Sequence, residues 1–213
     1  MFLTKIKNKL SAILSAKGRN RRIKKYRRKI KNTTFSVISS NCVGGVITHD
    51  LGVRFNSPFV NLFVDTKDFL KYLKDINEYN KKELCFLDFD GSYPKAKLGD
   101  ITVHFVHYKS NEEALEKWQT RLQRLNYDNL YIMMTEQNMC TEDDLVEFDN
   151  LPYQNKVVFT HKKYPLIKSA FYVKGFEDKG EVGNLVEQKS FLTGKRYYED
   201  FDFVSFFNKG LSK

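Results

Sequence analysis

Cysteine and long apolar runs are both scarce in this sequence, and each scarcity excludes a class of protein. The three cysteines, Cys42, Cys85 and Cys140, lie far apart and form neither a CxxC pair nor a Cys/His ligand spacing. An odd number of isolated cysteines is typical of reduced thiols rather than of a disulfide framework. Apolar runs stay below the ~18 residues of a membrane span, and none has the unbroken apolar stretch of a secretory signal. We therefore expect a cytoplasmic protein that is not exported and does not cross a bilayer.

Acidic residues are lacking from the first 31 positions. This segment holds 8 Lys and 5 Arg, although the whole chain of 213 residues has a formal net charge of only +10. Residues 32–213 consequently carry a net charge of −3. Apolar residues recur at helical spacing in the same segment and predict an amphipathic helix; they are Phe2, Leu3, Ile6, Leu10, Ile13 and Leu14. We divide the chain into a basic amphipathic tail, residues 1–32, and a single domain, residues 33–213.

An anionic membrane surface is the partner that suits this tail best. Anionic headgroups attract each Lys or Arg by about 1 kcal/mol, and the apolar face of such a helix is buried at the membrane interface. The phosphates of nucleic acid would attract the same charges but would not bury the apolar face. Residues 32–213 carry a net negative charge and offer phosphates no second surface, so we do not expect nucleic-acid binding. A solvated arm without a partner is the remaining alternative. We expect a peripheral position on the inner face of the plasma membrane.

From residue 33 onward, strand-like and helix-like patterns alternate with short connections. The expected strands are 34–40, 58–64, 83–89, 101–108, 129–135 and 156–161, with a further strand in 169–176. The expected helices are 44–55, 66–79 with Thr66 as N-cap, 111–125, 141–151 with Thr141 as N-cap, and a terminal aromatic helix in 195–208. This alternation predicts an α/β fold, a mostly parallel open sheet with helices on both faces in a Rossmann-like three-layer arrangement.

Polar clusters follow four of the expected strands. They are Asn41-Cys42 with Gly44-Gly45, the run from His104 to Lys109, the run from Thr135 to Asn138, and the run from Thr160 to Lys163. Ligands of open α/β sheets bind outside the carboxyl ends of the strands. We therefore expect these clusters to meet at one rim of the sheet.

The glycine pair and Arg54 have a functional and a structural interpretation. Gly44 and Gly45 at a strand-to-helix turn would let backbone amides approach a phosphate, but the same sequence also suits a plain tight turn. Arg54 would hold a phosphate or carboxylate with two hydrogen bonds, or else pair with an acidic residue of the protein.

The histidines divide into a core residue and candidates for chemistry. His104 alternates with apolar residues on a strand, which favours a hydrogen-bonded core histidine. His107 and His161 stand at strand ends, where they suit a general base or a phosphate contact. No HxH or HExxH spacing occurs, so we expect no zinc site.

Other catalytic motifs are weak or missing. Asp88 and Asp90 in LDFDGS follow an apolar strand, as do the carboxylates that hold a divalent cation in many sugar-nucleotide transferases, but an acidic turn has the same pattern. Cys42 and Cys140 lack an evident base, and the GxSxG elbow is absent, so neither a cysteine nor a serine nucleophile is expected.

Several long blocks of the sequence resemble a known bacterial family. The blocks are SSNCVGGVITHDLGVRFNSPFVNLF, KLGDITVHFVHYKS, MMTEQNMCTEDDLVEFDNLPY, KVVFTHKKYP and GKRYYEDFDF. They resemble the family called domain of unknown function 1919, often labelled exopolysaccharide or capsular polysaccharide biosynthesis protein, over nearly everything from residue 33 onward. The residues in matching blocks are Asn41, Cys42, Gly44, Gly45, His49, Arg54, Asn56, Ser57, Gly99, Asp100, His104, His107, Tyr108, Cys140, His161 and Arg196.

The resemblance and the strand-end clusters together predict a glycosyltransferase that moves a sugar from a nucleotide-sugar donor to a lipid-linked oligosaccharide. Amides near Gly44 and Gly45, with Arg54, would stabilise the diphosphate leaving group, and a base would take the proton of the acceptor hydroxyl. The expected base is Asp100, His107 or His161, and the other expected ligand contacts are Asn41, Cys42, His49, Asn56, Tyr108, Lys162 and Arg196. Two alternatives stay open: a transferase that adds acyl, phospho or pyruvyl groups to the same polymer, and a non-catalytic adaptor recruited to the membrane.

Overall fold

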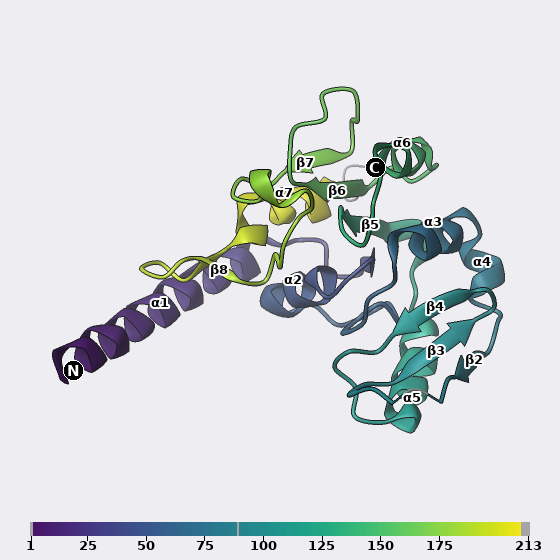
Figure 1. Cartoon of the computed structure of the whole chain (residues 1–213), viewed down its shortest axis with the longest axis horizontal. Coiled ribbons are helices and arrows are strands. Elements are labelled where there is room, and N and C mark those ends of the chain that lie inside the picture. The colour runs from purple at the N-terminus through teal and green to yellow at the C-terminus, as the bar shows by residue number, and fades with distance from the viewer. Residues whose placement is uncertain (1, 89, 210–213) are drawn as a thin grey trace.

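A computed structural model gives the fold of the chain and describes residues 2–88 and 90–209, with side chains from residue 12 onward (Figure 1). Its helices are α1 (Phe2–Lys29), α2 (Val43–Leu51), α3 (Thr66–Lys74), α4 (Ile76–Tyr79), α5 (Asn111–Leu122), α6 (Glu142–Asn150) and α7 (Phe203–Asn208), with three 3-10 turns, η1 (Tyr127–Asn129), η2 (Glu177–Lys179) and η3 (Tyr197–Asp200). Its strands are β1 (Ser36–Ser39), β2 (Leu84–Phe86), β3 (Lys95–Leu98), β4 (Ile101–His104), β5 (Leu130–Thr135), β6 (Lys156–Thr160), β7 (Ala170–Tyr172), β8 (Gln188–Ser190) and β9 (Lys195–Arg196).

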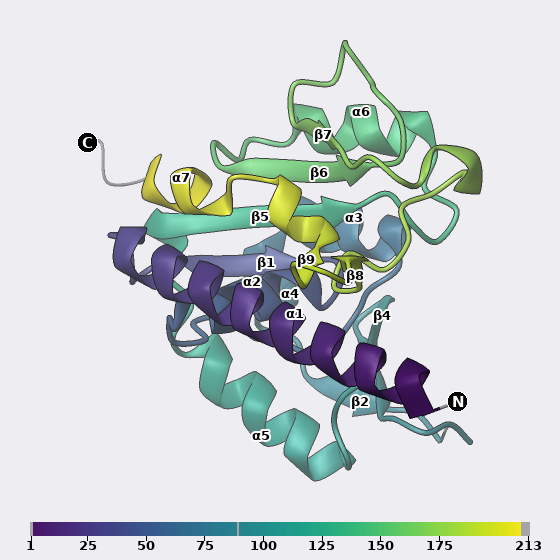
Figure 2. The same ribbon diagram turned by 90° about the vertical axis from the view of Figure 1, so that its left-hand side faces the viewer.

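A parallel sheet with the strand order β1-β5-β6-β7 forms the centre of the fold. Successive side chains of a strand point to opposite faces, so a strand buried on both faces is apolar throughout. In β5, Tyr131 and Met133 join one apolar cluster with α2 and α7, whereas Ile132 and Met134 join another with α3 and α6. Figure 2 shows α1 and α7 crossing one face of this sheet. The mixed α/β class with a parallel sheet is therefore confirmed, while the finer Rossmann-like arrangement stays a prediction.

The middle of the chain forms a separate antiparallel sheet, which the sequence does not predict. Its order is β2-β3-β4, so the expected strands at 83–89 and 101–108 pair outside the parallel sheet. The pattern misses β3 because Lys95 and Lys97 alternate with Ala96 and Leu98 in only four residues. A tight turn follows β3, in which Gly99 has φ +64°, a conformation that favours glycine.

The expected strand at 58–64 is wrong, because this segment bridges the two sheets instead of joining either. Phe63 exchanges two backbone hydrogen bonds of 2.9 Å with His104, and its neighbour Val64 donates a backbone hydrogen bond to Ser40. The segment thereby ties the end of β4 to the end of β1. Its apolar side chains lie in the core without a strand ladder.

Two expected helices are interrupted. Residues 66–79 form α3 and α4, with a break at Asp75, whose side chain accepts from the amide of Glu78. The N-cap of α3 is Asp65 and not Thr66, whose hydroxyl donates to the carbonyl of Gln137 instead. The expected terminal helix in 195–208 is β9, η3 and the short α7. By contrast, Thr141 caps α6 as expected, in a capping box with Asp144.

The expected N-terminal helix is present, and its second half packs on the domain. Arg19 donates two hydrogen bonds, of 2.7 and 2.8 Å, to the buried carboxylate of Asp50, and Tyr198 contacts the same carboxylate. Arg22 and Tyr26 both donate to Glu199. These contacts tie residues 15–30 to the domain expected to begin at residue 33. No helix in the described part of the chain is both long and apolar enough to cross a membrane.

Replacing Arg19 tests whether this ion pair fixes α1. Arg19→Ala is expected to lower the free energy of unfolding by about 3 kcal/mol, because it leaves a buried carboxylate without its cation. Urea unfolding followed by circular dichroism measures the change. The matched control is Arg21→Ala, which removes an exposed arginine of the same helix and is expected to change stability by less than about 0.5 kcal/mol. Equal losses in the two variants would show that the ion pair does not hold the helix.

Candidate functional site

The carboxyl ends of β1, β5 and β6 lie at one edge of the parallel sheet and carry polar residues there. Asn41 follows β1, Gln137 follows β5, and His161 follows β6. The polar run after β4 reaches the same region through the Phe63–His104 bridge, although β4 belongs to the other sheet. The structure thus brings together strand-end clusters from two different sheets.

A cavity of about 310 Å³ opens at this edge. Asn41, Cys42 and His107, three of the expected site residues, line it together. The other lining residues come from the start of α2, the bridge, the segment after β4, the loop after β5 and the segment before β8: Val43, Phe63, Val106, Gln137, Asn138, Glu181, Asn184, Leu185 and Val186.

A row of side-chain amides fixes the wall of this cavity. The backbone amide of Val43 donates to Asn41 Oδ1 over 3.1 Å, and Asn41 Nδ2 donates to Gln137 Oε1 over 2.9 Å. Gln137 Nε2 in turn donates to the carbonyl of Val182 over 2.8 Å. The row links α2, the loop after β5 and the segment before β8, so the cavity has a preformed wall.

The loop after β5 is held in a sparsely populated backbone conformation. Asn138 and Met139 have φ values of 55° and 60°, a left-handed region that non-glycine residues rarely adopt. The carboxylate of Glu181 accepts from the amide of Asn138 over 3.1 Å and helps to hold this turn. Such a conformation persists only where the surrounding structure enforces it, and it is often found at ligand sites.

The lining of the cavity suits a neutral polyhydroxy ligand. Amides, a carboxylate and an imidazole can donate to or accept from hydroxyl groups, while Phe63, Leu185 and Val186 offer apolar contact. No Lys or Arg occurs among the described residues of the lining. The first amides of α2 are already used within the chain, because that of Val43 is bonded to Asn41 and that of Gly44 to Ser39.

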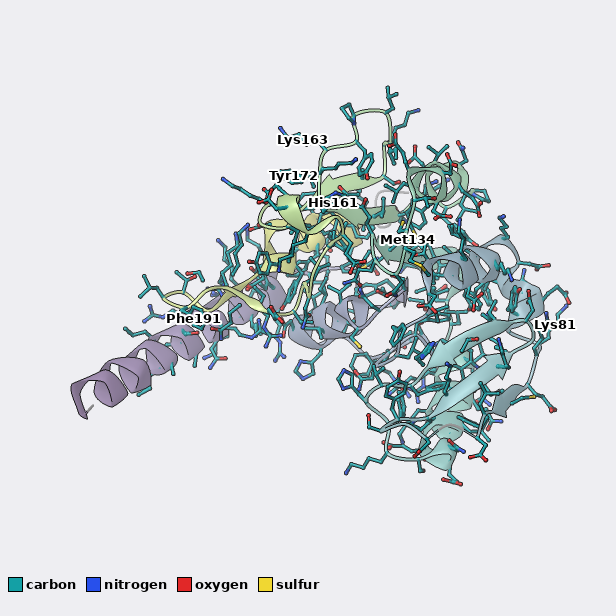
Figure 3. The ribbon with its side chains drawn as sticks, viewed as in Figure 1. Lys81, Met134, His161, Lys163, Tyr172 and Phe191 are labelled. Atoms are coloured by element: carbon teal, nitrogen blue, oxygen red, sulfur yellow. The ribbon has the colours of Figure 1, made fainter. Side chains whose placement is uncertain are left out.

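His161, labelled in Figure 3, follows β6 at the same edge, but its ring contacts a carboxylate and is not part of the described lining of the cavity. Its Nδ1 is 2.7 Å from Glu136 Oε2, and its backbone amide donates to the same oxygen over 2.8 Å. The hydroxyl of Tyr164 donates to the other oxygen of Glu136 over 2.6 Å. Burial and the Glu136 carboxylate raise the pKa of Tyr164 above its ordinary value. This cluster orients the imidazole as a carboxylate orients a catalytic base.

Several expected site residues lie away from the cavity. Arg54 is exposed near the amino end of β1, and Asn56 bonds there to the backbone of Phe35. His49 is exposed in the last turn of α2. Asp100 lies in the turn before β4, where hydrogen bonds from Tyr79 and Lys71 lower its pKa to about 2 and make it a weak base.

The remaining expected contacts have structural partners or sit on the surface. Tyr108 is buried, donates to the carbonyl of Val60 and accepts from Arg121. Arg196 is half-buried in β9, and its Nε has no hydrogen-bond partner in the described part of the protein. Lys162 is exposed just beyond β6. His104 is buried and stacks on Phe63 with ring centroids 4.2 Å apart, as a core histidine would.

Gly44 and Gly45 serve close packing. A Cβ added to Gly44 would lie 2.7 Å from Ser39 Cβ and 2.8 Å from Val37 Cγ1, so only glycine lets α2 approach β1 this closely. Gly45 faces Val60 with more room, because an added Cβ would lie 3.3 Å from Val60 Cγ1, and both glycines are buried. The interpretation as a phosphate cradle therefore has no accessible backbone to support it.

Asp88 and Asp90 are both exposed beyond β2. Within residues 12–88 and 90–209, no group of three or more His, Cys, Asp and Glu side chains is placed to share a metal ion. A cation site, which is one of the two interpretations of these aspartates beside a plain acidic turn, has no third protein ligand among the described residues.

Sequence patterns miss part of the cavity. Glu181 and Asn184 belong to an irregular segment between η2 and β8, and periodicity carries no signal for such a segment. Gln137 and Asn138 stand in one of the expected strand-end clusters, which is the signal that could have singled them out.

The comparisons with known proteins identify the family. The profile of the family described as Domain of unknown function (DUF1919) matches residues 14–208. The chain belongs to this family. An uncharacterized protein of Haemophilus influenzae is 48% identical over 204 residues, which make up 94% of this chain and 98% of that protein. The DUF1919 match begins inside α1, so the shared region includes the docked half of the helix, which the expected boundary between residues 32 and 33 leaves outside the domain.

Thiol reactivity tests the environment of Cys42 at the cavity. Burial raises the pKa of Cys42 from 9.0 to about 11, and burial with nearby Asp144 raises that of Cys140 to about 12. Iodoacetamide at neutral pH is expected to modify exposed Cys85 first and Cys42 roughly a hundredfold more slowly than an ordinary thiol, because only the thiolate reacts. Mass spectrometry of timed digests measures each rate, and a Cys85→Ser variant isolates the slow sites. Fast alkylation of Cys42 would reveal a thiolate and reopen its interpretation as a nucleophile.

Proposed function

We propose that this DUF1919 protein is a glycosyltransferase of surface-polysaccharide biosynthesis whose cavity binds the sugar part of a nucleotide-sugar donor. The observation that carries the proposal is the preformed cavity of amide, carboxylate and imidazole side chains at the carboxyl ends of β1 and β5. Side-chain amides and carboxylates bond well to sugar hydroxyls, and the apolar wall suits the face of a sugar ring. A Rossmann-like arrangement of the sheet would be in keeping with this activity.

In the proposed reaction, the acceptor hydroxyl attacks the anomeric carbon and the bond from that carbon to the diphosphate breaks. His107 lines the cavity and takes the proton of the hydroxyl as it attacks. The leaving diphosphate lies outside the cavity, because the described lining holds no cation. Lys162 and Lys163 are exposed just beyond β6 and supply positive charge at that edge; Figure 3 labels Lys163. The acceptor is a lipid-linked oligosaccharide.

Binding of nucleotide sugars tests the assignment of the cavity. Calorimetry with a panel of UDP- and GDP-sugars, with and without Mn²⁺, is expected to show saturable binding. Asn41→Ala should weaken the affinity about fivefold or more, because each hydrogen bond to a sugar contributes about 1 kcal/mol. His107→Ala should leave binding nearly intact but abolish transfer of the sugar.

The matched control is Asn77→Ala. Asn77 is an exposed asparagine that lines a different cavity, one that Pro152 and Gln154 also line near the start of β6. It is expected to bind donors as the wild type does. No binding across the whole panel would contradict the transferase proposal and favour a non-catalytic adaptor. Turnover of acetyl-CoA would favour transfer of an acyl group instead.

We further propose that α1 holds the protein on the inner face of the plasma membrane in the cytoplasm. The docked half of the helix uses one face for its contacts with the domain, through Ser15, Arg19, Arg22 and Tyr26. The opposite face is exposed and basic, and its residues follow a helical spacing: Lys17, Arg21, Lys24 and Arg28. Anionic lipids attract such a face at about 1 kcal/mol for each Lys or Arg.

Charge reversal on this face tests membrane association. A variant with Lys17→Glu, Arg21→Glu and Lys24→Glu is expected to lose at least a hundredfold in sedimentation with phosphatidylglycerol vesicles, since three attractive charges become repulsive. The control carries Lys82→Glu, Lys109→Glu and Lys168→Glu, which change the net charge equally on other exposed surfaces. If both variants lose binding to the vesicles equally, the loss is caused by the change of net charge, and the proposed role of α1 is contradicted.

A further inference from the structure

The β8–β9 hairpin presents two large apolar side chains at its apex. Residues 191–194 form a tight turn, in which the amide of Gly194 donates to Ser190 over 2.8 Å and Gly194 has φ +64°. Phe191 and Leu192 are each 76% exposed. Figure 3 shows Phe191 on this hairpin beside α1.

The hairpin is fixed against α1. A Cβ added to Gly194 would lie 2.6 Å from Ser15 Oγ, and one added to Gly18 would lie 2.6 Å from the carbonyl oxygen of Thr193. Arg22 Nη1 donates to that same carbonyl over 2.8 Å. The two glycines thus allow the apex to approach the helix closely, and the hydrogen bond from Arg22 fixes its position.

The same part of α1 exposes further apolar side chains. Leu14 is 53% exposed and precedes Gly18 by four residues, so it lies on the side of the helix that meets the hairpin, whereas Ile13, which is 47% exposed, shares the opposite face with Lys17. Figure 1 shows the first half of α1 and the hairpin projecting from the same side of the molecule. Exposed apolar residues that occur singly are common on proteins, but a group of them at one projecting end indicates an interaction site.

The charges around this end are positive and available. Glu199 is neutralised by Arg22, and Asp200 accepts from Lys189 and Lys195 over 2.5 and 2.6 Å. Lys17 and Arg21, in contrast, form no ion pair with any acidic residue that the structure describes. Docking of a second copy would bring two strongly basic helices together, whereas anionic headgroups would neutralise them.

We propose that the apex of the β8–β9 hairpin, Phe191 and Leu192, inserts with Leu14 into the interface of an anionic bilayer. This inference rests on the proposed membrane association of α1 and adds a second, apolar anchor from the far end of the sequence. Basic residues then bind the headgroups while the three apolar side chains enter the boundary of the acyl chains, as amphipathic surface anchors do. Two anchors fix the orientation of the protein relative to the membrane, whereas a single helix would let the protein rotate about the axis of that helix.

The experiment uses the full chain with vesicles of phosphatidylcholine, with and without phosphatidylglycerol. Phe191→Ser with Leu192→Ser is expected to weaken binding to the anionic vesicles roughly tenfold or more, because two buried apolar side chains are lost from the interface. The matched control is Leu166→Ser, which removes a leucine that is 94% exposed elsewhere and should bind as the wild type does.

A fluorescence measurement follows insertion directly. Phe191→Trp is expected to give a blue shift of emission with anionic vesicles, whereas Leu166→Trp should give none. The native Trp118 is buried and supplies a constant background.

Unchanged binding of the serine double variant, or no shift from Phe191→Trp, would overturn the hairpin anchor and leave the role of α1 standing. A wild type that ignores anionic vesicles would overturn both. A dimer in light scattering that the double variant abolishes would assign the apex to self-association instead. Donor binding is measured without vesicles, so the transferase proposal stands or falls separately.

Discussion

The close approach of α2 to β1 is the constraint on which the candidate site depends. Because Gly44 has no side chain, the helix lies against Val37 and Ser39, and the chain turns sharply at Asn41. That turn points Asn41 toward the loop after β5, where its amide meets Gln137. A larger residue at position 44 would push the helix outward and open the wall of the cavity. The glycines matter for the position of the site, although they make no contact with a ligand.

The sequence predicts the parallel sheet well, because β1, β5 and β6 are centred on apolar residues and lie in β-rich segments that are buried almost throughout. It fails for 58–64, where apolar residues are buried without a ladder. It also fails for β3, which is short and carries two lysines. Both failures lie at the second sheet: β3 is too short to show a periodic pattern, and residues 58–64 pair only through the bridge from Phe63 to His104, a distant contact that periodicity does not contain.

The candidate site likewise contains residues that the sequence pattern predicts and residues that it misses. Asn41 was predictable, because it stands at the carboxyl end of β1 and the edge of a parallel sheet collects such residues. His107 follows a strand of the other sheet and reaches the cavity through the Phe63–His104 bridge, which the sequence does not predict. Arg54 is close to Asn41 in sequence, but α2 carries the chain back toward the other end of β1, so the two separate. Glu181 reaches the cavity through its hydrogen bond to Asn138, a contact of the folded chain only. The sequence pattern thus identifies site residues at the ends of predictable strands and misses those placed by irregular segments.

The partners of α1 lie mostly near the other end of the chain. Arg22 and Tyr26 bond to Glu199, Arg19 touches Tyr198, and Asn208 accepts from the amide of Lys31. During synthesis, the ribosome releases this helix well before these partners. The arginines of the helix therefore lack the partners in η3 until that segment has been translated.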